Sequence, residues 1–400
     1  MQKRFVRVCY ACLAGGLLLA MHAAWAADGA APASAGKPPP AADVMTGATP
    51  KPELKAYDIT KPLLLPGEEQ HLRNARQLSF GHSPEYAAAA PDAANYAEAY
   101  WSPDMRHLIL QSTHDQWPCD QLFVLDLLTG GLRMLSDGRG RVTCGYFTAD
   151  SEHIIYSSTA ENGGPDCPPR PDYSHGYVWP VYDTYDVYMA DLATGKVECN
   201  LTHSPGYDAE ATIDWNCNWM YFTSTRDGDL DIYRMDLETD EVQRLTSDFG
   251  YDGGPFVSYD GQTIVYRKQF FQDEAARQEY AQLLKQNLIR PGDLELMAMN
   301  SDGNNKRQLT HNGASNFAPF LHPDNQTVIF SSNLDNPGGR YFELYTVPLS
   351  GGEPQRITYT EKGFEGFAMF SPDGKYIVWC SNRNQSRPNE TNVFVAEWIP

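Results

Sequence analysis

The chain from about Leu72 to Pro400 consists of short apolar runs separated by polar turns. The runs are rich in β-branched and aromatic residues, and Asp-Gly, Pro-Asp and Gly-Gly pairs stand between them. Runs of this kind are typical of strands, and these dipeptides are typical of tight turns. The pattern predicts an all-β domain with many short strands.

One landmark recurs along this region: an apolar run, a turn resembling Ser-Pro-Asp-Gly, and a second apolar run. The turns begin at Ser102, Thr148, Asp214, Ser258, His322 and Ser371. Their spacings are 46, 66, 44, 64 and 49 residues, so the period lies in the forties and two units carry insertions. With a third and usually a fourth strand in each unit, this period predicts six four-stranded propeller blades.

The sixth unit reaches Pro400 without a fourth strand, but a matching segment stands at the other end of the domain. "ARQLSFG" at 75–81 resembles "KRQLTHNG" at 306–313, which has the place of a fourth strand in the repeat. We therefore predict that the N-terminal strand pairs with the last blade. This pairing closes the ring and removes an exposed sheet edge.

The segments before the propeller predict an exported protein. Residues 1–26 have a basic start, an apolar run and the small-residue pattern Ala-Trp-Ala, which together indicate a cleaved signal peptide. Residues 27–66 are rich in Ala and Pro and indicate a linker, followed by the propeller at 67–400. No later stretch has the length and apolarity of a membrane span. We expect a periplasmic protein without a membrane span.

Charge narrows the choice of partner. The formal charge of −20 becomes −23 when the three basic residues of the signal peptide are removed. Such a protein repels the phosphate backbone, which argues against nucleic acid. We expect a monomer whose partner is a periplasmic or envelope protein, a peptide or a glycan. The alternative, that the acidic residues only solvate the surface, stays open.

The repeat also carries a family resemblance. The repeated segment resembles the repeat of TolB-type β-propellers. It consists of Leu-Thr, a gap, Gly-Tyr-Asp, an apolar strand and then Ser-Pro-Asp-Gly. The segments "SPGYDAEATID" at 204–214 and "DFGYDGGPFVS" at 248–258 are two of its copies. The resemblance covers residues 72–400 and implies a periplasmic protein that acts through protein contacts. TolB also has an α/β domain ahead of its propeller, which residues 27–66 do not match, so a role in the Tol–Pal system is not implied.

The repeated sequence segment that begins with Leu-Thr also predicts a binding rim. In a propeller blade, the link into the first strand and the link between the second and third strands emerge on one face, here called the insertion face. Four consecutive innermost strands begin there with an acid or its amide, and other acids and aromatic residues lie beside them. The candidate ligand-binding residues are Glu98, Asp208, Glu210, Asp252, Asn316, Glu365, Tyr207, Tyr251, Tyr177 and Trp179. Such a rim suits Ca²⁺ or a basic peptide end. The alternative is that each acid holds its own loop by accepting backbone N–H bonds.

Both long insertions fall on the same face. Residues 161–186 combine several prolines with five aromatic residues, a composition that suits a peptide or a sugar ring. Residues 270–292 contain an apolar stripe from Ala276 to Leu288 that predicts a helix, ended by Pro291 and Gly292. The helix is a lid or docking element over the channel, or it packs on the scaffold, and the loop aromatics have the same two interpretations.

Six cysteines remain after cleavage of the signal peptide, and export permits disulfides. The face assigned to each residue favours two pairs that join neighbouring blades, Cys119 with Cys144 and Cys199 with Cys217. Cys380 lies in a buried second strand and is expected to be a free core thiol. Cys167 has no assigned partner.

Catalytic motifs are scarce. Gly-x-Ser-x-Gly does not occur, and the last predicted blade runs to Pro400, so a prolyl-oligopeptidase-like hydrolase is disfavoured. The enzymatic alternative is a metal-assisted polysaccharide lyase or hydrolase, because oligogalacturonate lyases resemble TolB-type propellers and hold a metal with histidines. His203 and His311 occupy equivalent positions in nonadjacent blades and are poorly placed to share an ion, which leaves His175 as a lone candidate. The sequence favours a non-catalytic binding or scaffold propeller that uses its insertion face.

Overall fold

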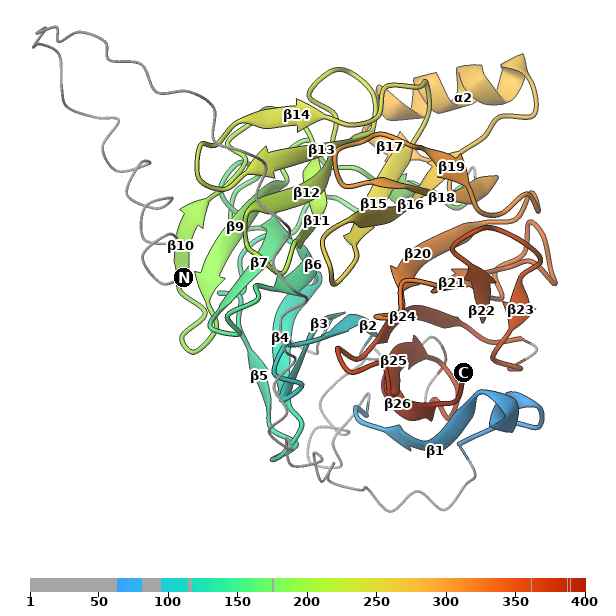
Figure 1. Cartoon of the computed structure of the whole chain (residues 1–400). Coiled ribbons are helices and arrows are strands. Elements are labelled where there is room, and N and C mark those ends of the chain that lie inside the picture. The colour runs from blue at the N-terminus through green and yellow to red at the C-terminus, as the bar shows by residue number, and fades with distance from the viewer. Residues whose placement is uncertain are drawn as a thin grey trace, which may run out of the picture.

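The computed structural model describes residues 63–80, 95–113, 117–174, 176–360, 362–386, 388 and 390–400. Within these residues, six four-stranded antiparallel sheets surround a central axis, as Figure 1 shows. The prediction of a six-bladed β-propeller is confirmed. The predicted signal peptide and nearly all of the predicted linker lie outside the described residues.

In the first three blades, the strands run from the axis outward in sequence order. Blade one contains β2 (Asn95–Trp101), β3 (His107–Thr113), β4 (Gln121–Asp126) and β5 (Leu132–Met134). Blade two contains β6 (Val142–Phe147), β7 (His153–Ser158), β9 (Asp186–Asp191) and β10 (Val197–Asn200). Blade three contains β11 (Asp208–Ile213), β12 (Trp219–Ser224), β13 (Asp231–Asp236) and β14 (Val242–Arg244).

The remaining blades follow the same plan until the last strand. Blade four contains β15 (Asp252–Val257), β16 (Thr263–Gln269), β18 (Leu294–Asn300) and β19 (Arg307–Gln308). Blade five contains β20 (Asn316–Leu321), β21 (Thr327–Ser332), β22 (Glu343–Pro348) and β23 (Gln355–Arg356). Blade six contains β24 (Glu365–Phe370), β25 (Tyr376–Ser381) and β26 (Asn392–Trp398), with β1 (Leu72–Gln77) as its outer strand.

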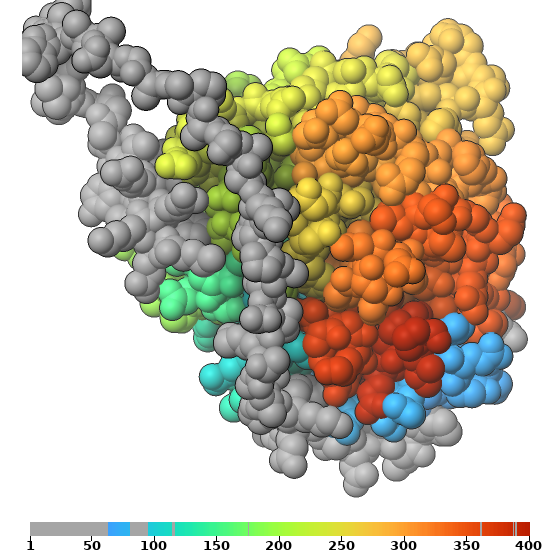
Figure 2. All heavy atoms as spheres, viewed as in Figure 1, coloured from blue at the N-terminus to red at the C-terminus, as the bar shows by residue number. Residues whose placement is uncertain are grey.

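The ring closes as the sequence predicts. β1 pairs antiparallel with β26, placing Leu72 opposite Trp398 and Gln77 opposite Phe394. Just before β1, the short 3₁₀ helix η1 (Glu68–Gln70) packs onto the same blade. In Figure 2 this N-terminal segment, in blue, lies against the C-terminal strands, in red. One blade therefore joins both ends of the described chain, and the outer edge of β26 is paired.

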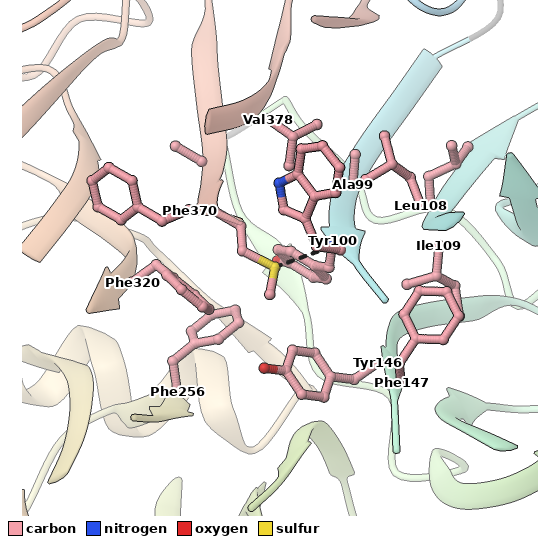
Figure 3. Close-up of a cluster of buried hydrophobic side chains, with 14 of the residues drawn as sticks. Ala99, Tyr100, Leu108, Ile109, Tyr146, Phe147, Phe256, Phe320, Phe370 and Val378 are labelled. Carbon is pink, nitrogen blue, oxygen red and sulfur yellow. Dashed lines mark hydrogen bonds between the residues drawn. The ribbon is translucent and has the colours of Figure 1, made fainter. Parts of the chain in front are cut away.

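Apolar side chains from the innermost strands fill the channel. Tyr100, Tyr146, Phe256 and Phe320 come from four different blades and point toward one another (Figure 3). The ring centroids lie 5.4 Å apart for Tyr100 and Phe256, 6.3 Å for Tyr146 and Phe256, and 5.6 Å for Phe256 and Phe320. All three contacts are edge-to-face, which is a favourable aromatic geometry. The channel is therefore blocked by its own core.

The two insertions meet outside the blades. β8 (Trp179–Pro180), in the insertion of blade two, pairs with β17 (Leu288–Ile289), in that of blade four. The predicted helix is present as α2 (Glu274–Leu284), with Asp273 as its N-cap, and Figure 1 shows it at the periphery. The Tyr280 hydroxyl on α2 donates to Asp229 at 2.5 Å, so the helix packs on the scaffold rather than over the channel. No helix among the described residues is long and apolar enough to span a membrane.

Candidate functional site

A cavity of about 1430 Å³ lies at the insertion-face end of the channel. Its floor is formed by the beginnings of the innermost strands, and its walls include Tyr177 and Trp179 from the first insertion and Arg290 from the second. Because the aromatic layer of the channel lies beneath this floor, the cavity is blind. Its volume exceeds that of pockets for drug-sized molecules, so it has room for a larger ligand.

The floor is a ring of six bulged residues. Every innermost strand shifts register against the second strand near its middle, and the shift coincides with one residue in the left-handed region. These residues are Glu98 (φ 52°), Cys144 (54°), Glu210 (58°), Gly254 (59°), Ala318 (49°) and Phe367 (56°), and all six line the cavity. Five are not glycine, and left-handed backbone costs such residues about 1 kcal/mol or more each. Bulges of this kind re-aim side chains, here toward the axis.

Four of the predicted rim residues do not line the cavity. A strand without a bulge would place Asp208 and Glu210 on the same side, but the bulge sends Glu210 into the cavity and leaves Asp208 buried. The same separation buries Asp252, Asn316 and Glu365, which are 0–1% exposed.

The four buried residues have partners within their own blades. Arg226 Nη2 donates to Asp208 at 3.1 Å and Lys268 Nζ donates to Asp252 at 3.2 Å. Ser332 Oγ donates to Asn316 Oδ1, and Ser381 Oγ donates to Glu365 Oε1. Each tie therefore runs to a side chain at or just beyond the end of the second strand, whereas the sequence-based alternative expected backbone N–H donors. Burial raises the pKa of Asp208 to about 6, against the opposing effect of Arg226.

Glu210 lines the cavity and accepts several hydrogen bonds. Tyr251 Oη donates to it at 2.7 Å, Gly254 N at 2.8 Å and Thr223 Oγ1 at 2.7 Å, and the Arg267 guanidinium forms an ion pair with it. Arg267 also donates to the Tyr251 hydroxyl. Four donors hold this carboxylate in place and neutralise its charge, so it stabilises the wall of the cavity.

Gly254 makes room for this ion pair. A Cβ atom at Gly254 would lie 2.2 Å from Arg267 Nη1, so the guanidinium occupies the space that a side chain at position 254 would fill. The guanidinium carbon lies 5.5 Å from the Trp179 ring centroid and 4.9 Å from that of Tyr251. Arg267 is not among the site residues predicted from the sequence. The signal for it is a cation in the interior of an apolar strand, opposite the Gly-Gly pair of "YDGGPF".

Glu98 is the other carboxyl group in the ring, and the charge of Arg267 acts on it. It forms no ion pair with any residue that the structure describes, and its exposed part faces the cavity. Burial raises the pKa of Glu98 to about 7; a hydrogen bond from the Cys144 thiol opposes the rise, and the charge of Glu210 adds to it. Burial and the adjacent Glu98 also raise the pKa of Cys144 well above its usual value, so this thiol stays protonated.

The mouth of the cavity presents aromatic faces. Tyr173 and Tyr177 are 48% and 49% exposed and stack with their ring centroids 6.3 Å apart. The guanidinium of Arg340 lies 4.9 Å from the Tyr177 centroid. Tyr182 belongs to the same insertion and packs against its buried cluster, so the packing interpretation holds for it. Tyr185 is buried too, but it lines the cavity. Tyr207 and Tyr251 are buried and line the deeper wall.

Phenylalanines from blades five and six form another part of the wall, and Phe317 contacts Trp179 edge-to-face with centroids 6.3 Å apart. Phe317 contacts Phe342 and Phe367 edge-to-face, with centroids 5.1 Å and 5.4 Å apart. Phe364 stacks on Phe317 at 6.4 Å. All four line the cavity, so this part of its wall is apolar.

The structure corrects the predicted disulfides. Cys119 pairs with Cys167 of the first insertion, while Cys144 and Cys217 are free thiols, so neither predicted pair forms. The prediction assigned each cysteine to a face but ignored its distance from the axis. Cys144 lies on an innermost strand and faces the cavity, whereas Cys119 lies farther out, where the insertion passes. Cys199 lies on the outermost strand β10, but the Cys217 thiol contacts the inner turn at Ala149.

Cys380 is free and fully buried, as predicted.

The residues at the cavity do not fit a metal site. Among the described residues, no three His, Cys, Asp or Glu side chains form a metal-ligand cluster. Arg267 takes up the charge of Glu210, and Lys268 and Arg383 take up those of Asp252 and Glu365. The carboxylates predicted for Ca²⁺ are thus largely used within the protein.

The histidines considered for a metal site do not gather at the cavity. His203 and His311 are exposed and do not line it. His175 lies outside the described residues.

Sequence comparisons place the chain only broadly. No protein-family model matches it. An uncharacterized protein of Agrobacterium fabrum is 27% identical over 192 residues, which are 42% of this chain and 63% of that protein. The uncharacterized peptidase YuxL of Bacillus subtilis is 24% identical over 254 residues, which are 62% of this chain and 33% of that protein. The chain thus spans less than two thirds of either relative.

Solved structures share the architecture. TolB from Acinetobacter baumannii covers 76% of this chain and 63% of its own at 17% identity and a TM-score of 0.49. The match to a putative TolB from Agrobacterium tumefaciens covers 76% of this chain and 90% of that chain, at 17% identity and a TM-score of 0.49. The chain is similar to TolB propellers. An oligogalacturonate lyase in complex with manganese covers 81% and 93% at 14% identity and a TM-score of 0.48. The six-bladed fold itself rests on the strand pairing of this chain.

Proposed function

We propose that this chain is an exported, non-catalytic binding propeller that takes up one end of a ligand through the cavity of its insertion face. The ligand is a periplasmic or envelope protein, a peptide or a glycan. The blind cavity is the observation that carries this proposal. A ligand can enter from the insertion face, but the aromatic layer stops it from passing through.

The walls support binding rather than covalent chemistry. Exposed Tyr173 and Tyr177 at the mouth, and phenylalanines deeper in, offer flat apolar surfaces of the kind that anchor ligands. The Glu210 carboxylate already pairs with Arg267 and accepts three further hydrogen bonds, so this pair shapes the wall. Apolar walls with a few convergent polar groups are typical of ligand sites.

The test is capture of partners by the mature protein from its native envelope, with mild cross-linking and mass spectrometry. The wild type is compared with Tyr177→Ala, which removes an exposed aromatic face from the mouth. Phe249→Ala is the matched control, because Phe249 is 40% exposed but does not line the cavity.

A partner recovered in near-stoichiometric yield by the wild type and the control, and lost by Tyr177→Ala, supports the proposal. A partner retained by all three proteins places binding elsewhere. If the wild type yields no reproducible partner, the proposal of a binding module fails for that envelope, and fractionation of the cells shows whether the protein is exported at all.

A further inference from the structure

The bulge ring is chemically divided. Blades one to three contribute Glu98, Cys144 and Glu210, whereas blades four to six contribute Gly254, Ala318 and Phe367. Three adjacent blades thus place polar groups on one side of the floor, opposite an apolar side. A ligand end that reaches the floor meets both halves.

The deep cations are already neutralised. Arg267 pairs with Glu210, and Arg141, which also lines the cavity, pairs with Asp120. Both guanidinium groups therefore have reduced attraction for an incoming anion. Glu98 is in the opposite situation, because no cation of the described residues pairs with it. Among the described residues, Glu98 is therefore a carboxyl group at the floor without an ion-pair partner.

A carboxyl group in an aromatic cavity attracts a compact cation. The aromatic rings of Tyr100 and Tyr146, with centroids 6.1 Å apart, lie beneath the six bulged residues. They belong to the blades that carry Glu98 and Cys144. Aromatic faces attract cations electrostatically. A divalent metal would require several anionic ligands, whereas an ammonium group needs one carboxylate and a few hydrogen-bond acceptors. The floor fits an ammonium group better than a metal ion.

We propose that the floor of the cavity captures a protonated primary amine at the end of the ligand, with Glu98 as its counter-ion. This inference rests on the proposed function and specifies the chemistry of the ligand. The amine is the N-terminus of a polypeptide or the side chain of a lysine, and capture of a terminal amine is a known mode of peptide recognition.

Amine capture couples binding to pH. Besides Glu98, the charged or titratable groups that face this position are Tyr100 on β2, Cys144 on β6, Glu210 on β11, Arg267 on β16, Asp120 before β4 and Cys380 on β25. Glu98, whose pKa is about 7, must ionise to pair with the amine. The ionised fraction rises about tenfold between pH 6 and pH 8, so affinity for an amine of high pKa should rise about tenfold as well.

The experiment uses isothermal titration calorimetry on the mature protein. The probe is 2-phenylethylamine, and 2-phenylethanol is its neutral counterpart. We expect the amine to bind, the alcohol to bind at least about tenfold more weakly, and Glu98→Gln to lose about tenfold or more in amine affinity. Glu241→Gln, on an exposed turn far from the cavity lining, is the matched control and should bind like the wild type.

A second measurement needs no variant. Titrations at pH 7 in two buffers of different ionisation enthalpy should show release of about half a proton per amine bound, because Glu98 is about half protonated there. Equal affinity for amine and alcohol, or amine binding without proton release, overturns the proposal. So does an unchanged affinity in folded Glu98→Gln.

Peptide probes distinguish the two sources of the amine. A short peptide with a free N-terminus and no lysine is compared with an N-acetylated peptide that contains one lysine. An N-terminal amine, with a pKa of about 7.7–8.0, should bind best near neutral pH, whereas lysine should bind more tightly up to about pH 9. If envelope capture depends on Tyr177 but persists in Glu98→Gln, amine recognition is wrong while the binding function stands.

Discussion

Arg383 provides the sharpest test of how the propeller is closed. Its guanidinium donates to both oxygens of Glu68 at 2.9 Å, to Leu63 O at 2.9 Å and to Glu365 Oε1 at 3.1 Å. Glu68 and Glu365 are both fully buried. One arginine therefore joins the segment before β1 to the innermost strand of blade six and compensates two buried carboxylates.

The change Arg383→Met keeps much of the side-chain volume and removes the charge. Removing one partner of a buried ion pair costs about 3–5 kcal/mol, because the remaining charge is left without compensation. The carboxylates retain other donors: Trp379 Nε1 and Ser381 Oγ for Glu365, and two backbone N–H groups for Glu68. We therefore expect a loss of about 3 kcal/mol in the free energy of unfolding, at the lower end of that range.

Arg73→Met is the matched control. Arg73 also links the N-terminal segment to blade six, through Glu397 at 2.9 Å, but its side chain is 66% exposed. Exposed ion pairs contribute about 0–1 kcal/mol. Urea unfolding followed by tryptophan fluorescence measures both variants, provided that the slope with denaturant is unchanged.

The pH dependence supplies a second check on Arg383→Met. Burial raises the pKa of Glu365 to about 7 even with the arginine present, so in the variant protonation can relieve the buried charge. The loss of stability should be smaller at pH 5 than at pH 8. Equal losses in Arg383→Met and Arg73→Met, or a loss below about 1 kcal/mol in Arg383→Met at pH 8, would refute the view that this buried network holds the closure.

Three further predictions concern the cavity and its support. The pKa of Glu98 is raised from 4.5 to about 7 in the folded protein, so its contribution to stability is present at low pH and is lost as the pH rises through 7. Between pH 5 and pH 7, the free energy of unfolding should therefore fall by about 2 kcal/mol more in the wild type than in Glu98→Gln. Urea titration at each pH measures this difference. Replacing Cys119 and Cys167 by serine opens a crosslink between residues 48 apart, and chain entropy predicts a loss of about 4 kcal/mol under oxidising conditions. Gly254→Ala places a methyl group against Arg267, which should disrupt the ion pair with Glu210 and cost about 3 kcal/mol in the same urea assay.

Each of these predictions has a control. Parallel pH profiles for the wild type and Glu98→Gln would mean that Glu98 titrates normally in the folded protein. The serine variant should match the wild type treated with reductant, and a difference between them would point to effects other than the crosslink. Gly313→Ala has a similar φ of 65° with no atom near the added methyl group, so it should cost only about 1 kcal/mol. If Gly254→Ala costs no more than this, the close approach of Arg267 is not constraining.

Much of the fold follows from the sequence. Alternating apolar runs and turn residues act over a few positions, so the six landmarks from Ser102 to Ser371 predict the first two strands of each blade directly. The similarity of residues 75–81 to an outer strand predicts the closure, because an unpaired strand edge is unfavourable wherever it occurs. The insertions were also assigned to the correct face, since strand order fixes where each loop emerges.

The site was less predictable. The candidate rim joined Asp208 and Glu210 through the two-residue period of a regular strand, but a bulge between them sends one inward to an ion pair and the other into the cavity. Gly254 has no side chain and therefore leaves room for Arg267, which forms an ion pair with Glu210 on another blade. Such an arrangement depends on residues about fifty positions apart, and no local pattern encodes it.

The sequence by itself therefore determined the number of blades, their strand order, the closure and the face on which the insertions lie, because these depend on local periodicity and on chain connectivity. Only the tertiary structure decided which thiols meet, which acids form ion pairs and which carboxyl group of the described residues does not. Cys119 meets Cys167, and Glu98 has no ion-pair partner in the described part of the chain, because distances from the axis and the packing of neighbouring blades set these contacts. Charge compensation is a property of three-dimensional neighbours, and it is this property that gives the cavity its chemistry.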